Sequence, residues 1–381
     1  MLESKLPEVG TTIFTVMSKL AADCDALNLS QGFPDFSPPA GLTDAVARYF
    51  AGGPNQYAPM AGAPALLEAI AEQIERHYGP QLDPATEITV TPGATEALFC
   101  AIHTLVRPGD EVIVFDPAYD SYAPAVKLAG GRTRHLPLLA PDFSVDWDRF
   151  SEALSPATRL VIVNSPHNPT GSVWSVEDLN ELAARTAGRE IFVLSDEVYE
   201  HVVFEGRKHA TVLTHPELAG RSLAVFSFGK SFHATGWKVG YLAAPPQLTA
   251  EFRKVHQFCQ FCVVHPVQLG LAEFIRSEPD FLDNLGRFYQ ERRDHLAAEL
   301  RPGPLKLLPC AGTYFQTVDY SALSDEPDQT LAERLTREVG VATIPVSVFY
   351  QSPPAQRLLR LCFAKDPAVL TEAAARLNNA A

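Results

Sequence analysis

Short apolar runs alternate with stretches of helical periodicity along the middle of this 381-residue chain. The runs carry almost no charge and are rich in Val, Ile, Leu and Phe, which is typical of strands buried on both faces of a parallel sheet. They cover residues 88–91, 112–115, 160–163, 191–194 and 222–226. Because strands and helices alternate from about residue 88 to 245, the pattern predicts an α/β fold with a large doubly wound domain and a mostly parallel central sheet.

The pattern changes near both ends of the chain. From about residue 270 it turns to long charged helices, such as 280–300, and then to short strands, which predicts a smaller α+β C-terminal domain. The first residues show too little pattern for a domain and are expected to form an arm that joins the small domain. We therefore expect an arm (1–35), a large domain (36–270) and a small domain (271–381), which suits the length of the chain.

Polar residues follow the predicted strands where each one ends. They are Gly93, Ala94 and Thr95 after the first run, Tyr119 after the second, Asn168 after the third, Asp196 and Tyr199 after the fourth, and Ser227, Lys230 and Lys238 after the fifth. The carboxyl ends of parallel strands meet at one edge of a sheet, where open α/β sheets bind their ligands. We therefore expect these side chains to form one site.

Lys230 is the most informative of these residues, because it lies in a Ser/Gly loop directly after a buried strand. The run Gly229-Lys230-Ser231 resembles the end of a phosphate-binding P-loop, but that motif needs glycine six residues before the lysine, and residue 224 is alanine. A lysine in this position can instead form a Schiff base. Pyridoxal 5'-phosphate (PLP) is the cofactor that most often uses such a lysine.

The neighbouring polar residues match the groups of PLP. A carboxylate against the ring nitrogen keeps that nitrogen protonated, and Asp196 is the candidate, since Glu197 should point to the opposite face of the strand. Asn168 and Tyr199 are suitable donors to the negatively charged ring oxygen. The ring of Tyr119 is expected to stack on the cofactor ring.

A phosphate group fits the predicted helix that begins at Gly93, Ala94 and Thr95. Free backbone N–H groups and the helix dipole favour an anion at such a terminus. Ser227 and Lys238 are expected to complete this phosphate site.

Arg360 lies in the otherwise apolar run 358–363, where an unpaired guanidinium would be costly. A planar guanidinium binds a carboxylate at two points, so a substrate carboxylate would explain its position. An internal salt bridge is the alternative. Arg357 is a second candidate for the carboxylate, but it lies before the apolar run.

Composition excludes several classes of function. The net charge is −14 and no basic stripe is present, so nucleic acid is not an expected partner. No signal peptide opens the chain and no apolar run is long enough to span a bilayer, so we expect a cytoplasmic protein without membrane contact.

Six irregularly spaced cysteines suit a reducing compartment. Cys259 and Cys262 form a lone CxxC in a helix-like stretch without the second pair of a zinc site, and no metal is expected.

Motifs in a fixed order along nearly the whole chain resemble the class I aminotransferases of PLP fold type I. The similarity is greatest to the bacterial methionine aminotransferases and the kynurenine aminotransferase group. The motifs are NLSQGFPDF (28–36), NQY (55–57), NPTG (168–171), SDEVY (195–199), the run 227–240 and RLCF (360–363). This resemblance implies that PLP is the cofactor, that Lys230 holds it, and that Asp196, Asn168, Tyr199 and Tyr119 take the roles given above.

The resemblance also implies residues for the substrate and the partner subunit. Gly32 (through its backbone), Asn168 and Arg360 would bind the substrate α-carboxylate. Tyr57 would reach the phosphate of the neighbouring subunit, which implies a homodimer with shared active sites. Phe14 and Phe33 are candidates for an apolar, aromatic wall around the substrate side chain.

We therefore expect transamination between an L-amino acid and a 2-oxo acid, with methionine and other large apolar or aromatic amino acids as donors. The same fold and lysine would also serve a PLP-dependent lyase that splits C–S bonds. Kynurenine–oxoglutarate transaminase activity is a further alternative, although this chain has Val263-Val264 where that group tends to carry Phe-His. A regulator that acts by binding would need a DNA-binding module, for which the residues before 28 leave no room.

Overall fold

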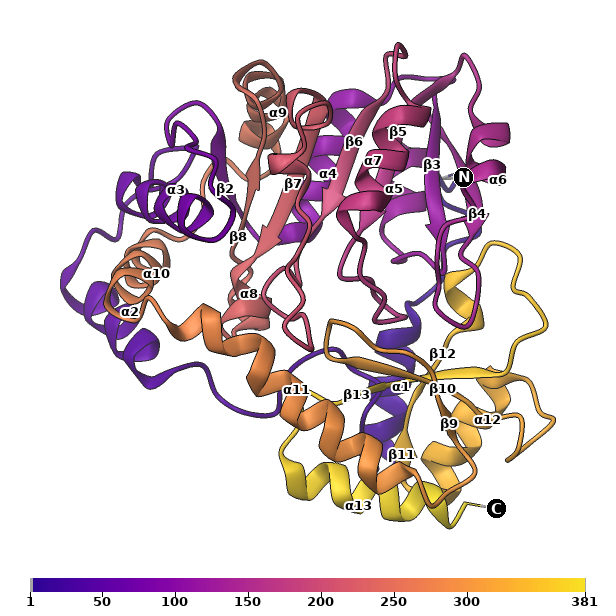
Figure 1. The fold of residues 1–381 in the computed structure, drawn as a ribbon. Coiled ribbons are helices and arrows are strands. Elements are labelled where there is room, and N and C mark those ends of the chain that lie inside the picture. Colours follow the sequence, from indigo (N-terminus) through magenta and orange to yellow (C-terminus); the bar gives the residue numbers. More distant parts are fainter. Residues whose placement is uncertain (1–2, 381) are drawn as a thin grey trace.

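A seven-stranded sheet forms the centre of the larger part of the molecule (Figure 1). The structure is a computed structural model and describes residues 3–380. The strand order is β2 (Ile88–Thr91), β8 (Gly240–Ala243), β7 (Ser222–Ser227), β6 (Phe192–Asp196), β5 (Thr158–Asn164), β3 (Glu111–Asp116) and β4 (Arg132–Pro137). β8 runs antiparallel to both neighbours and the remaining strands run in one direction, so the five predicted strands end at the same edge.

Helices cover both faces of this sheet, which explains why its central strands are apolar throughout. α4 (Ala94–Leu105), α5 (Tyr122–Leu128) and α9 (Pro246–Cys259) share one apolar cluster with the strands. α6 (Trp147–Ala153) and α7 (Val176–Arg185) belong to the cluster on the opposite face. The prediction of a doubly wound domain is confirmed.

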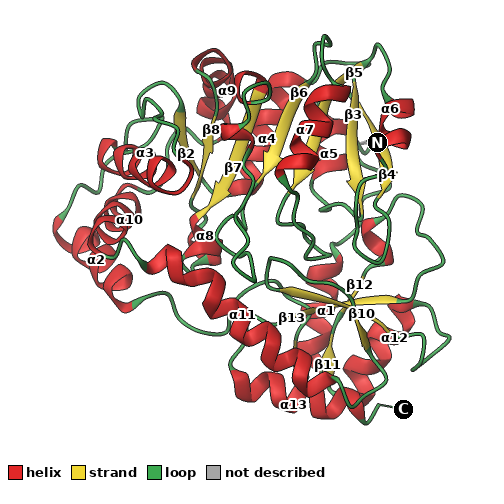
Figure 2. Ribbon diagram, in the orientation of Figure 1, coloured by secondary structure: helices red, strands yellow, loops and turns green. Residues whose placement is uncertain are grey.

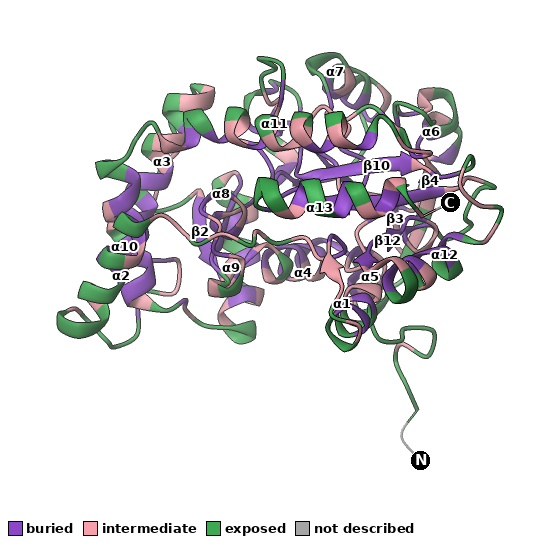
Figure 3. Ribbon diagram, turned by 90° about the horizontal axis from the view of Figure 1, so that it is seen from below, coloured by how far each residue is buried: buried purple, intermediate pink, exposed green. Residues whose placement is uncertain are grey.

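The C-terminal part contains a smaller antiparallel sheet, which Figure 2 shows below the large one. Its strand order is β12 (Ile344–Pro345), β13 (Leu358–Cys362), β10 (Phe315–Asp319) and β9 (Lys306–Leu307). α11 (Phe281–Leu300) and α13 (Pro367–Asn378) lie side by side against it, and Figure 3 shows their buried and exposed faces. α12 (Asp328–Arg334) packs on β12 and β13. Mixed helices and short strands are what the sequence predicts here.

The N-terminal segment is joined to the C-terminal part through a short parallel pair. α1 (Ile13–Asp23) leads into β1 (Leu27–Asn28), which pairs with β11 (Val341–Ala342). The residues before α1 are mostly exposed, and Glu8 among them pairs with Lys127 of α5 (Figure 3 shows the chain end extending outward from this region). Between residues 3 and 380, no helix combines the length and the apolar content that crossing a membrane requires.

Three helices, α2 (Ala40–Gly52), α3 (Pro64–Tyr78) and α10 (His265–Ser277), pack together at one side of the large sheet (Figure 1). Gly270 of α10 lies against Val46 of α2, where a Cβ would be 2.4 Å from Cγ2 and 3.0 Å from the backbone nitrogen of Val46. The close contact of α10 with α2 therefore depends on the absence of a side chain at Gly270. The domain boundary that the sequence predicts, between residues 270 and 271, falls inside α10.

We predict that Gly270→Ala destabilises the protein by ~1–3 kcal/mol, because the added methyl meets the Val46 backbone, which cannot turn away. The measurement is the midpoint of thermal or urea unfolding. Gly52→Ala, near the end of α2, is the matched control, since nothing lies within 4 Å of its Cβ position. Equal midpoints for the two variants would contradict the account of this helix contact.

Candidate active site

Lys230 lies at the carboxyl edge of the large sheet, just after β7. The sequence predicts a Ser/Gly loop here, but the structure has a single helical turn, α8 (Phe228–Ser231). The reason is that Phe228 and Phe232, four residues apart, are both buried and stack with ring centroids 5.8 Å apart. The turn fixes Lys230 between two buried aromatic residues.

The side chain of Lys230 is half-buried, and two groups from distant parts of the chain hold its amine. Its Nζ donates to the hydroxyl of Tyr314 at 2.9 Å and to the carbonyl oxygen of Gly32 at 3.3 Å. The Tyr314 hydroxyl in turn donates to Gly32 O at 2.8 Å. Burial, together with the cations of Lys238 and Arg360, lowers the pKa of Lys230 to about 8. Near neutral pH, a lysine with this pKa is in its neutral, nucleophilic form far more often than a solvent-exposed lysine is.

The carboxylate of Asp196 has one oxygen bound and one free. Oδ2 accepts a hydrogen bond from the Tyr122 hydroxyl at 2.5 Å, whereas Oδ1 is buried without a partner. Burial raises the pKa of Asp196 to about 6, against the effect of the Tyr122 hydroxyl. Glu197 turns away and accepts a hydrogen bond at 2.6 Å from His209. A buried carboxylate with a free acceptor fits a protonated ring nitrogen.

A cavity of about 150 Å³ lies between the strand ends. Predicted residues that line it are Ala94, Thr95, Tyr119, Asn168, Asp196, Tyr199, Ser227, Lys230 and Lys238. They come from segments spread over about 145 residues, which the parallel strands bring to one edge. Leu98, Asn164, Val198 and Thr235, which were not predicted, complete the lining.

One end of this cavity is built for an anion. α4 begins at Ala94 as predicted, with Gly93 as its N-cap residue at φ 81°, a conformation that favours glycine. A Cβ on Gly93 would lie 3.2 Å from Nζ of Lys238. The backbone N–H groups of the first turn and this ammonium therefore face the same space, as a phosphate site requires.

Arg360 is completely buried and lies on β13. Its guanidinium donates to Asn168 Oδ1 at 2.8 Å and to Ser30 O at 2.7 Å, and Nε has no partner. Its Cζ lies 3.9 Å from the centroid of the Phe315 ring. Burial lowers the pKa of Arg360 to about 10. No carboxylate in residues 3–380 forms a salt bridge with Arg360, so the alternative of an internal salt bridge does not explain its position.

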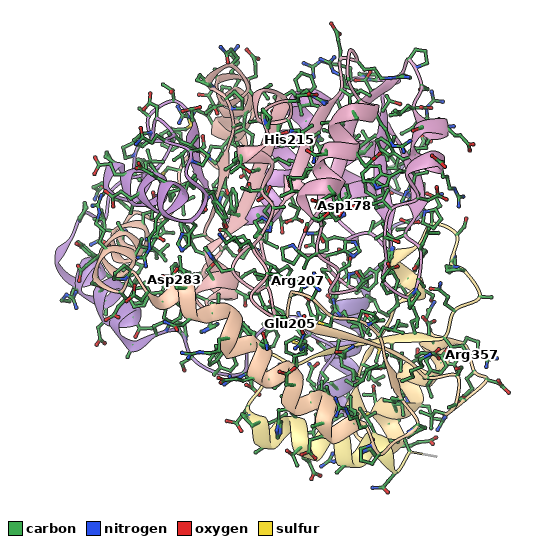
Figure 4. All side chains as sticks on the ribbon, viewed as in Figure 1. Asp178, Glu205, Arg207, His215, Asp283 and Arg357 are labelled. Atoms are coloured by element: carbon green, nitrogen blue, oxygen red, sulfur yellow. The ribbon has the colours of Figure 1, made fainter. Side chains whose placement is uncertain are left out.

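Arg357, the second candidate for the carboxylate, is not part of the site. It pairs with Asp325 at 2.6 Å and lies at the edge of the C-terminal part, away from the large sheet (Figure 4). Its side chain is 40% exposed, so the ion pair explains its position without a ligand.

Of the two predicted aromatic residues, Phe14 lies next to Arg360. Its ring centroid is 5.2 Å from the guanidinium carbon and 5.7 Å from the ring of Phe349. Phe33 contacts Lys365 instead, with Nζ 4.8 Å from the ring centroid, and is 40% exposed. Phe14 and Phe349 thus form an aromatic surface beside the guanidinium.

Tyr57 does not line the cavity of its own chain. It is 82% exposed, and its ring packs edge-on against Phe261 at 5.5 Å. Phe258 is 87% exposed and Phe261 48%, so several apolar side chains of this region face solvent.

Sequence reasoning missed Tyr314, Tyr122, Asn164 and Phe349. Asn164 ends β5 and Tyr122 begins α5 three residues after Tyr119, so position relative to the strand ends was a usable signal for both. Tyr314 and Phe349 come from the C-terminal part, where no local pattern connects them with Lys230 or Arg360.

The chain matches the family model for aminotransferases of class I and II over residues 25–377. It is 55% identical to the methionine aminotransferase of Escherichia coli (strain K12) over 376 residues, 99% of this chain and 97% of that protein. It is 34% identical to a kynurenine–oxoglutarate transaminase of Dictyostelium discoideum, with 96% of this chain and 93% of that protein covered.

Solved structures agree with this match. An Escherichia coli protein reported to have a methionine aminotransferase function superposes with a TM-score of 0.98 at 54% identity, covering 100% of this chain and 99% of that chain. An N-succinyldiaminopimelate aminotransferase from Mycobacterium tuberculosis gives 0.97 at 38% identity, with both chains fully covered. The predicted family, fold type and cofactor are confirmed. The chain belongs to the class I and II aminotransferases and is a PLP-dependent transaminase of fold type I.

Proposed function

We propose that this aminotransferase transfers the amino group of methionine, and of other large apolar or aromatic L-amino acids, to a 2-oxo acid. The observation that carries this proposal is 55% identity with a methionine aminotransferase over 99% of the chain. The aromatic surface of Phe14 and Phe349 beside Arg360 supports it, because an apolar side chain would pack against these rings.

PLP, when bound, withdraws electrons from the substrate Cα so that its proton can leave. We propose that Asp196 keeps the ring nitrogen protonated, since its Oδ1 has no other partner. Asn168 and Tyr199 would donate to the ring oxygen, and Tyr119 would stack on the ring. The start of α4 (Gly93, Ala94, Thr95), Ser227 and Lys238 would bind the phosphate. All of these residues except Gly93 line the same cavity.

Lys230 would hold the cofactor through its amine. When that amine is free, it would accept the proton that leaves the substrate Cα and would be the group that moves this proton. Tyr314 and the Gly32 carbonyl keep that amine in place while it is free, because both are within hydrogen-bond distance of Nζ. Tyr314 is therefore a positioning residue in this proposal.

The substrate α-carboxylate binds Arg360. Among the residues that the structure describes, Nε of Arg360 has no hydrogen-bond partner and the guanidinium has no acidic partner to displace. Since Asn168 accepts from Arg360 through Oδ1, its NH₂ group stays free to donate. The backbone of Gly32 closes this side of the site, where a Cβ would lie 2.7 Å from the Phe315 ring.

We further propose a cytoplasmic homodimer with shared active sites, in which Tyr57 reaches the phosphate bound by the neighbour. Support comes from the exposure of Tyr57, which is 82%, and from its contact with the exposed ring of Phe261. Exposed aromatic groups of this kind are typical of interfaces. The free cysteines suit a reducing compartment.

A panel of amino acids assayed with several 2-oxo acids tests the substrate class. We predict a kcat/KM for methionine and phenylalanine at least ~100-fold above that for aspartate, because a second carboxylate would be buried against aromatic rings without a partner. Kynurenine belongs in the same panel. A preference for aspartate would contradict the proposal, and release of ammonia and a 2-oxo acid without an acceptor would identify a lyase.

Tyr314→Phe should lower kcat about tenfold, the cost of one hydrogen bond to the catalytic amine, with little change in KM. The matched control is Tyr320→Phe, which removes a buried hydroxyl bonded to Glu326 O outside the site. Steady-state kinetics of both variants, after saturation with PLP, provide the measurement. A Tyr314→Phe enzyme as active as the control would remove Tyr314 from the mechanism.

The pKa of Lys230, lowered to about 8, predicts how the apoenzyme takes up PLP at different pH values. A lysine reacts only when neutral, so the rate constant should rise with pH and level off above about pH 8. An ordinary lysine, with a pKa near 10.4, would continue to gain reactivity up to about pH 10. Stopped-flow absorbance gives the rates, and N-α-acetyllysine provides the reference that corrects for ionisation of PLP itself.

Mixing two inactive variants tests the shared site. Lys230→Ala and Tyr57→Asp should each be nearly inactive as homodimers. If Tyr57 acts in the neighbouring subunit, a mixed dimer contains one site with both residues intact, and up to about half of the activity per mixed dimer returns after subunit exchange. No return of activity while mass spectrometry detects mixed dimers would place Tyr57 in its own subunit's site.

A further inference from the structure

The hydroxyl of Tyr122 is the one side-chain donor that reaches the carboxylate of Asp196 among the residues that the structure describes. It donates to Oδ2 at 2.5 Å, and both side chains are buried. Asp196 lines the cavity of about 150 Å³, whereas Tyr122 does not. The hydroxyl therefore holds the carboxylate from outside that cavity, and within the described part of the chain it leaves Oδ1 without a partner.

The main chain of Asp196 is held without help from Tyr122. Asp196 is the last residue of β6, where it pairs with Asn164 on β5 and with Val225 on β7. Asn164 also donates through Nδ2 to the carbonyl oxygen of Asp196 at 2.9 Å. We therefore expect the carboxylate to stay at the cavity when the hydroxyl is removed, so that the loss is electrostatic.

Tyr122 is itself fixed in place and remains a donor. It begins α5, its backbone N–H donates to the carbonyl oxygen of Tyr119 at 3.2 Å, and the two rings meet edge to face with centroids 5.6 Å apart. Burial, and then the charge of Asp196, raise the pKa of the Tyr122 hydroxyl well above its ordinary value. A phenol that keeps its proton stabilises the ionised form of a carboxylate to which it donates.

Burial of Asp196 works against this ionised form. It raises the pKa of Asp196 to about 6, and the largest effect in the opposite direction is the hydrogen bond from Tyr122. A hydrogen bond to a charged group changes an equilibrium by a factor of roughly ten to a hundred. Without the hydroxyl, the carboxyl group would therefore be largely neutral near pH 7.

We propose that the Tyr122 hydroxyl keeps Asp196 ionised, so that the free Oδ1 can accept from a protonated ring nitrogen of the cofactor. Tyr122 is then a positioning residue, which acts on the cofactor only through Asp196. The inference rests on the role of Asp196 in the proposed function, and it is independent of which amino acid is the donor. It also gives the two tyrosines of the segment 119–122 separate roles, one against the cofactor ring and one behind the carboxylate.

Other titratable groups lie around Asp196 and Tyr122, and a test must separate them from the hydroxyl. They are Lys230 and Lys238, which line the same cavity as Asp196, Glu197 and Tyr199, which follow β6, Tyr119, which precedes α5, and His167, which lines a small space with Tyr122 and Asn164. Replacing Tyr122 leaves all of these groups in place. A difference between the variant and the parent enzyme therefore reports the hydroxyl.

The test measures how pH changes the affinity of the full-length apoenzyme for pyridoxamine 5'-phosphate, the amine form of the cofactor, which cannot form a Schiff base with Lys230. Calorimetry gives each affinity, which is divided by that of Asp196→Asn at the same pH to cancel the ionisation of the free ligand. In the parent enzyme this ratio should fall as pH drops through about 6, because the carboxyl group gains a proton and no longer pairs with the ring nitrogen. In Tyr122→Phe the fall should begin about one to two pH units higher.

Tyr78→Phe is the matched control, because it removes a hydroxyl that donates to the buried carboxylate of Glu200, which does not line the cavity. Its ratio should fall at the same pH as that of the parent. A single 3-fluorotyrosine in place of Tyr122 serves if Tyr122→Phe does not fold. This phenol is more acidic and donates more strongly, so it should move the fall below the pH of the parent.

The outcomes separate Tyr122 from Asp196. An unchanged pH midpoint in Tyr122→Phe or in the fluorotyrosine enzyme, or an equal shift in Tyr78→Phe, overturns the role of Tyr122 and leaves that of Asp196 intact. A ratio that does not change with pH in the parent enzyme removes the role of Asp196, and the proposal for Tyr122 with it. The preference among amino acid substrates is untouched by either result, because no amino acid is present.

Discussion

Partial burial of the Lys230 side chain is the constraint on which the rest of the site depends. An ammonium that loses part of its hydration is costly, so this position favours the neutral amine and lowers its pKa to about 8. Tyr314 and Gly32 compensate with two acceptors, and both come from outside the sheet that carries the lysine. The reactive amine therefore exists only when the N-terminal segment, the large sheet and the C-terminal part are assembled together.

Charge in the site is organised around the same point. Lys230 and Lys238 line a cavity whose single lining carboxylate is that of Asp196, and Arg360 donates a hydrogen bond to Asn168, which also lines the cavity. This excess of positive charge suits a phosphorylated cofactor and a carboxylate substrate, and it further disfavours the charged form of Lys230. The anion site at the start of α4 and Arg360 on β13 belong to different parts of the fold, so the two anionic groups have separate positions.

Much of the fold and of the site was predictable because the strands are parallel and buried. Once a strand is recognised by its apolar run, the residues just after it must lie at the common edge, and this rule alone located Asp196, Asn168, Tyr119 and the start of α4. Arg360 was recognisable because a charge inside an apolar strand is expensive. Tyr314 was not, since its contact with Lys230 spans 84 residues and has no local signature.

The one-turn helix at Lys230 shows a different limit. Serine and glycine suggested a loop, but tertiary packing of Phe228 and Phe232 determined the local conformation. Tyr57 marks a third limit, because its contact within its own chain is with Phe261 and it does not line the cavity, so the structure of one chain assigns it no role.

The central claim is that Lys230, rather than the nearby Lys238, holds the cofactor. Borohydride reduction makes the bond between PLP and its lysine permanent, and proteolysis with mass spectrometry then identifies the modified residue. The account predicts one phosphopyridoxyl group per chain, on the peptide that contains Lys230 and on that lysine. Modification of Lys238 or of a surface lysine instead, or a reduced enzyme without the label, would contradict it.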